Sequence, residues 1–154
     1  MRTYTLNIGQ VATHVGQAQY KCFGLGSCIG LFLSDRLTGV TGAAHILLPD
    51  NERGPDVHGW YSAEAAIEEL IRRFQERGSS LTALSAKLAG GANTLNAHDT
   101  GGRNVDSVLR QLRKRSIFIA GSDVGGTQSR TVEYETATGS LTVRRQGERT
   151  GTIL

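Results

Sequence analysis

Two apolar runs separated by a short polar break constrain the fold of this chain more than any other feature. The first run reads CIGLFLSD and the second VTGAAHILLP, with the letters RLTG between them. Two apolar runs joined by so short a turn predict a β-hairpin. A loop of residues 35–38 pairs Ser34 with Gly39. In an unbulged antiparallel ladder the same register pairs Cys28 with His45.

The remaining pattern predicts two helices and several more strands. Apolar residues recur at helical spacing over residues 62–77 and 104–115, with Asn104 as the expected N-cap of the second helix. Strands are expected over residues 81–89 and 117–120, and a further hairpin over residues 131–136 and 141–145. Because strands outnumber helices and no βαβ unit repeats, we expect an α+β fold of mixed β-sheets.

Length and charge exclude several classes of protein. A chain of 154 residues has the usual size of one domain, so we expect a single domain over residues 1–154. No stretch approaches the ~20 apolar residues of a membrane span, and the first ten residues lack the apolar core of a signal peptide. We therefore expect a cytoplasmic protein without membrane insertion. The net charge of +3 is modest, and the basic run at residues 110–115 suits a helix end, so no nucleic-acid partner is expected.

Glycine is enriched and clustered. The chain has 20 glycines, and they gather at residues 24–30, 90–91, 101–102 and 125–126. Such clusters mark places where the backbone turns tightly or approaches another group closely. We expect the clusters at 90–91 and 125–126 either to frame a cleft or to be plain turns.

Cys28 and His45 form the candidate catalytic pair. In the expected register their Cβ atoms lie ~5 Å apart on one face of the hairpin. A histidine can accept the thiol proton, and the imidazolium then stabilises the thiolate. Gly26 and Ser27 precede the thiol, and backbone N–H groups in such a turn can stabilise an oxyanion. A buried thiol beside a core histidine remains an open alternative.

Other interpretations of these residues are weaker. The glycines before Cys28 do not match the spacing of a dinucleotide fingerprint, and no helix follows them. Cys22 and Cys28 are not a C-x-x-C pair, and adding His45 and His58 gives no standard zinc spacing, so no metal is expected. We expect His14 and His98 to be ordinary surface or core residues.

Five blocks of the sequence resemble the chemoreceptor glutamine deamidase family, CheD, over nearly the whole chain. GLGSCIG with AAHILLP resembles the family's nucleophile and histidine segments. The blocks WYSAEAAI, AKLAGGAN, TGGRN and DVGGTQSRTVEYETATG follow in the family's order.

This resemblance implies a sandwich of sheets flanked by helices, related to bacterial toxin cysteine deamidases. It implies conversion of chemoreceptor glutamines to glutamates without a cofactor, and in some members hydrolysis of receptor methyl esters. Cys28 is then the nucleophile and His45 the general base and acid. Ser27 and Gly26 are our candidate substrate-binding residues, with the backbone amides of Ser27 and Cys28 to hold the substrate amide or its oxyanion. The third catalytic position, commonly threonine in the family, is Cys22 here. That departure favours one alternative, a silent adapter that binds a chemoreceptor or a CheC-type phosphatase.

Overall fold

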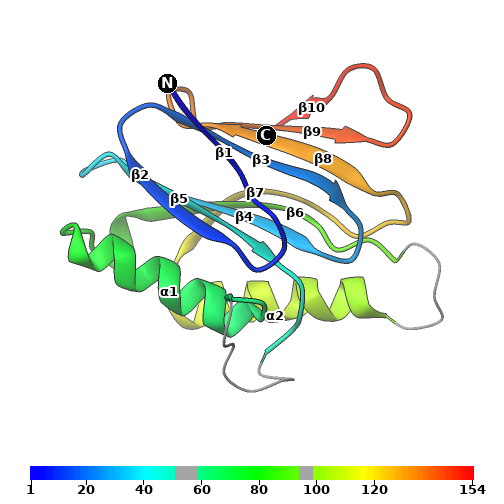
Figure 1. The fold of residues 1–154 in the computed structure, drawn as a ribbon. Helices are drawn as coiled ribbons and strands as arrows, with labels where there is room; N and C mark the ends of the chain where they lie inside the picture. Colours follow the sequence, from blue (N-terminus) through cyan, green and yellow to red (C-terminus); the bar gives the residue numbers. More distant parts are fainter. Residues whose placement is uncertain (51–58, 94–98) are drawn as a thin grey trace.

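The computed structural model describes residues 1–50, 59–93 and 99–154, and it arranges them in three layers (Figure 1). The first layer is a five-stranded sheet in the order β1 (Arg2–Thr5), β3 (Ala18–Leu25), β8 (Arg130–Glu135), β9 (Ser140–Arg145) and β10 (Thr152–Ile153). The second is a five-stranded sheet in the order β2 (Val11–Val15), β5 (Val40–Ile46), β4 (Ile29–Asp35), β6 (Leu84–Gly90) and β7 (Phe118–Val124). The third layer contains the helices α1 (Ala63–Glu76) and α2 (Thr100–Lys114).

Both sheets are mixed, which confirms the expected α+β class. In the first sheet β1 pairs parallel with β3, and in the second β6 pairs parallel with β7, whereas the other pairs are antiparallel. Among the described residues, no helix is long and apolar enough to cross a membrane. The relation to bacterial toxin deamidases stays a prediction.

The second sheet has an apolar core on each face. Ile29, Leu31 and Leu33 of β4 pack with the helices, whereas Phe32 packs in the core between the two sheets. A strand that is covered on both faces has a continuous apolar sequence instead of strict alternation. This double burial explains why the two hairpin runs are apolar throughout.

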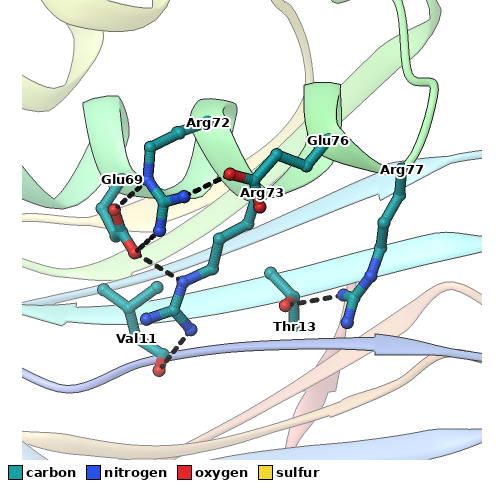
Figure 2. A network of polar contacts seen from close by, with 7 residues as sticks. All are labelled: Val11, Thr13, Glu69, Arg72, Arg73, Glu76 and Arg77. Carbon is teal, nitrogen blue, oxygen red and sulfur yellow. Dashed lines mark hydrogen bonds and ion pairs between the residues drawn. The ribbon is translucent and has the colours of Figure 1, made fainter.

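Helix α1 forms where the sequence predicts it. Its N-cap is Ser62, whose side chain accepts a hydrogen bond from the backbone N–H of Ala65 at 3.1 Å. Its apolar face is buried as expected, and two arginines beside this face reach the edge strand β2 (Figure 2). Arg73 donates to the Val11 carbonyl at 3.3 Å, and Arg77 donates to the Thr13 hydroxyl at 2.8 Å. These contacts tie α1 to the strand that follows the N-terminal segment.

Helix α2 begins earlier than predicted, and the expected N-cap is wrong. The helix starts at Thr100, and its N-cap is Asp99, whose carboxylate accepts from the Gly102 N–H at 3.2 Å. Asn104 therefore lies one turn inside the helix, where its side chain is fully buried. Gly101 allows this start, because a Cβ there would lie 2.4 Å from the Ala92 carbonyl oxygen.

The hairpin is confirmed, but its predicted register is wrong by two residues. Strands β4 and β5 pair Ser34 with Thr41, and Gly30 with His45. The loop covers residues 36–39, because Asp35 stays in β4 and its carboxylate accepts from the N–H of Leu37 at 2.9 Å. A shift by two residues leaves every side chain on its predicted face, since side chains alternate with a period of two.

Candidate active site

The loop of residues 26–28 connects β3 to β4 and presents its N–H groups. Three donors hold its successive carbonyls: Ala92 N–H binds Gly26 O at 2.8 Å, Asn104 Nδ2 binds Ser27 O at 2.8 Å, and Gly91 N–H binds Cys28 O at 2.9 Å. Within residues 1–50, 59–93 and 99–154, the N–H groups of Ser27 and Cys28 have no hydrogen-bond acceptor. Two backbone donors are thus available beside the Cys28 thiol, as an oxyanion requires.

The glycine cluster at residues 90–91 lies against this loop, and the cluster at residues 125–126 lies against residues 90 and 93. Gly90 has a φ of +114°, and a Cβ there would be 2.1 Å from the Cys28 carbonyl oxygen. The Gly125 N–H donates to Gly90 O at 2.9 Å, and the Asn93 N–H donates to Gly126 O at 2.9 Å. The close approach of backbone to backbone requires glycine at position 90.

His45 is held by the N-terminal segment. Its side chain is 5% exposed, and its Nδ1 lies 2.9 Å from the Leu6 carbonyl oxygen. A carbonyl only accepts hydrogen bonds, so Nδ1 carries the proton and Nε2 is the unprotonated nitrogen. The His45 backbone N–H donates to Gln10 O, and the Gly9 N–H donates to His45 O. Residues 6–10 therefore fix both the position of the histidine and its tautomer.

Cys28 and His45 lie on the same face of the second sheet. Cys28 belongs to the core between the sheets, and the His45 ring bonds to Leu6 of that core. Since His45 pairs with Gly30, Cys28 is its diagonal neighbour, a relation that typically separates Cα atoms by ~7–8 Å. Among the hydrogen bonds of the described residues, none joins the Cys28 thiol to the His45 ring. Gly30, which pairs with His45, contributes no side chain to this face.

Burial sets the protonation states of the pair. It raises the pKa of the Cys28 thiol to about 11 and lowers the pKa of His45 below its ordinary value of 6.5. The hydrogen bond to Leu6 acts on the pKa of His45 in the opposite direction but is the smaller effect. Burial therefore favours the neutral thiol and the neutral imidazole near pH 7.

Cys22 lies in β3 and is completely buried in the core between the sheets. Burial, and secondarily the nearby Cys28 thiol, raise the pKa of Cys22 to about 12. Cys28, with a pKa of about 11, is the more acidic thiol. No hydrogen bond between Cys22 and His45 occurs in the described part of the chain, and Leu6 makes the contact that orients the imidazole.

The other sequence candidates lie in different settings. Gly26 and Ser27 are half-buried beside Cys28. His14 binds the Tyr4 hydroxyl at 2.9 Å, and His58 and His98 lie outside the described residues. Within the described ranges, no three metal-binding side chains cluster.

Leu6 and Asn104 were missed from the sequence. Leu6 acts through its backbone carbonyl, which leaves no signal in the residue type. Asn104 could have been found from the sequence, because a polar residue at an apolar position of a helix indicates a buried side chain that needs hydrogen-bond partners.

A comparison with protein families decides the relationship of the chain. Residues 47–145 match the family described as CheD chemotactic sensory transduction. The chain belongs to the CheD family. The matched range begins after Cys28 and His45, so the match to the family model does not itself cover these two residues.

Two CheD relatives extend over most of the chain. A protein of Thermotoga maritima named chemoreceptor glutamine deamidase CheD is 34% identical over 144 residues, covering 92% of this chain and 91% of the relative. A CheD of the same name from Halalkalibacterium halodurans is 38% identical over 136 residues, covering 82% and 84%.

Among solved structures, a Neisseria meningitidis protein superposes with a TM-score of 0.47 at 12% identity. The match covers 82% of this chain and 63% of that one, so the chain spans less than two thirds of its length.

Proposed function

We propose that this chain hydrolyses the side-chain amide of chemoreceptor glutamines, which yields glutamate and ammonia. The observation that carries the proposal is the joint placement of a thiol, an unprotonated imidazole nitrogen and two N–H groups that have no acceptor among the described residues. Cys28, His45 and the loop of residues 26–28 supply these three parts. The names of the two CheD relatives support the substrate, because both are called chemoreceptor glutamine deamidases.

The first half of the reaction forms a thioester. Nε2 of His45 takes the proton from the Cys28 thiol as the sulfur attacks the amide carbon. The carbonyl oxygen becomes an oxyanion, which the N–H groups of Ser27 and Cys28 stabilise. The intermediate collapses, His45 returns the proton to the departing nitrogen, and ammonia leaves. Because the thiol is neutral beforehand, its proton moves during the attack.

The second half consumes one water molecule. His45 accepts a proton from the water, whose oxygen attacks the thioester carbon and forms a second oxyanion in the same place. Its collapse breaks the carbon–sulfur bond and releases the glutamate carboxylic acid, while the proton on His45 returns to the Cys28 sulfur. A glutamate methyl ester enters the same cycle with methanol in place of ammonia, so the proposal includes methyl ester hydrolysis.

A second candidate function follows from Cys22. The family commonly has threonine at this position, and a chain that lacks an essential hydroxyl would serve as a silent adapter for a chemoreceptor or a CheC-type phosphatase. The contact between His45 and Leu6 argues for catalysis, because a backbone carbonyl orients the imidazole without any hydroxyl. We retain the CheC-type phosphatase as a proposed regulatory partner and the cytoplasm as the proposed location.

Ammonia release from a cytoplasmic chemoreceptor fragment tests the proposal. We expect turnover with the native chain and none with Cys28→Ala, which keeps the fold but lacks the nucleophile. Cys28→Ser is the matched control of similar shape with a weaker nucleophile. Tight receptor binding without any ammonia release by the native chain would favour the adapter.

A further inference from the structure

Asn104 joins the two segments that contain the candidate catalytic pair. Its side chain is fully buried in α2, and Nδ2 donates to Ser27 O at 2.8 Å and to Leu47 O at 3.0 Å. Ser27 directly precedes the thiol, and Leu47 follows His45 by two residues. Both partners are carbonyls, so the nitrogen of the amide faces them and uses both of its hydrogens. Its Oδ1 has no partner among the described residues.

The bond to Ser27 determines where the Cys28 N–H points. The Ser27 carbonyl and the Cys28 N–H belong to one planar peptide unit, and the described residues contain no cis peptide bond. In a trans unit the C=O and N–H bonds point in opposite directions. Asn104 holds the carbonyl toward α2, which packs on the outer face of the second sheet. The Cys28 N–H therefore points away from α2, to the side where the thiol lies.

Within the loop of residues 26–28, the Ser27–Cys28 peptide is the one whose carbonyl is held by a side chain. Backbone N–H groups of Ala92 and Gly91 hold the carbonyls of Gly26 and Cys28, respectively. Only Ser27 O, between them, is held by a side chain. If that bond is lost, the peptide is free to rotate and turn its carbonyl toward the thiol. A carbonyl oxygen there repels an oxyanion instead of stabilising it.

We propose that Asn104 is a positioning residue that holds the Ser27–Cys28 peptide in the orientation where the Cys28 N–H stabilises the oxyanion. The inference rests on the proposed amide hydrolysis and adds a residue that does not touch the substrate. Through Leu47, the same side chain also holds the chain just beyond His45 in place relative to the nucleophile loop.

The test uses Asn104→Asp in the full chain. The substitution keeps the size of the side chain but places a carboxylate oxygen against both carbonyls in place of the donor. We measure kcat and KM for ammonia release from the receptor fragment, the rate of Cys28 alkylation by iodoacetamide, and the melting temperature. Alkylation forms no oxyanion, so it reports thiol access and acidity alone.

The expected result is a selective loss of kcat. Removal of an oxyanion donor typically lowers kcat about 10²-fold or more, whereas KM and the alkylation rate should stay within about threefold, less than 1 kcal/mol. The matched control is Val108→Ala, which shortens a fully buried apolar side chain of the same helix and leaves the hydrogen bonds from Asn104 to Ser27 and Leu47 in place. It should lower the melting temperature while kcat at a permissive temperature is unchanged.

Two results would overturn the inference. An unchanged kcat in folded Asn104→Asp contradicts the positioning role. So does a fall of kcat that only matches the fraction of unfolded protein, which faster alkylation of the exposed Cys28 thiol would reveal. If Asn104→Asp does not fold, Asn104→Ser serves in its place, because its short hydroxyl cannot span both carbonyls, and the same selective loss is expected. A native chain without amide turnover refutes the proposed function itself, whereas native turnover with an unaffected variant refutes only the role of Asn104.

Discussion

Replacement of Cys22 by threonine tests how the imidazole is oriented. The substitution introduces the threonine that the sequence resemblance leads us to expect at this position, where the native side chain is completely buried between the sheets. In this structure the proton on Nδ1 of His45 already binds Leu6 O at 2.9 Å. The Leu6 N–H in turn donates to the Lys21 carbonyl at 2.9 Å, which ties the orienting residue to β3. The histidine therefore has its partner whichever side chain occupies position 22.

The two possible roles of the hydroxyl predict very different magnitudes. If Leu6 orients the ring, Cys22→Thr changes kcat/KM by no more than about tenfold, or ~1.4 kcal/mol. If a hydroxyl is essential, the native chain lacks an orienting group, a loss that costs about 10⁴-fold in a well-studied catalytic triad. Ammonia release from a receptor fragment separates the two, with Cys28→Ala as the inactive reference.

A stability measurement completes this comparison. A hydroxyl in a dry core without a partner costs ~1–3 kcal/mol in the free energy of unfolding. Urea unfolding of Cys22→Thr, with Cys22→Ala as the control without a polar atom, shows whether the hydroxyl finds an acceptor. A native chain as inactive as Cys28→Ala and rescued only by Cys22→Thr would refute the reasoning.

Three further predictions concern the same site. Iodoacetamide should label Cys28 before Cys22, because Cys28 has the lower pKa, about 11 against about 12; peptide mapping that finds Cys22 modified first reverses the assignment. The acid limb of kcat/KM should fall below pH 6.5, because burial lowers the pKa of His45 and keeps the ring unprotonated to a lower pH; a limb above 6.5 in a pH–rate profile contradicts this. Gly139→Ala is the control for Gly90→Ala, because Gly139 also has a positive φ but has open space around it. We expect Gly139→Ala to keep full activity and to lower the free energy of unfolding in urea by ~1–2 kcal/mol. Gly90→Ala should lower it by more and should abolish turnover.

Features set by local pattern were predictable from the sequence. The apolar spacing of residues 62–77 matched α1, and the two runs around residues 36–39 matched β4 and β5. The face shared by Cys28 and His45 was also predictable, because it depends only on whether the strand positions are odd or even. Such signals are contained in the residue types themselves.

Features set by tertiary contacts were not predictable. Strands β1, β2 and β3 were missed, although Leu6 directly follows β1 and β3 contains Cys22. The predicted register was wrong because the side chain of Asp35 bonds into the turn and moves the loop by one residue. Asn104 was assigned as an N-cap because asparagine favours that position, whereas its donors serve carbonyls that are 57 and 77 residues away.

The most direct test of the account is peptide mass spectrometry of a chemoreceptor fragment after incubation with the native chain, Cys28→Ala or His45→Gln. The account predicts that particular glutamines become glutamates with the native chain, and that both variants leave these residues as amides. Conversion at the native rate by Cys28→Ala would contradict the assignment of the nucleophile. Intact glutamines after incubation with a folded, receptor-bound native chain would contradict the proposed deamidation as a whole.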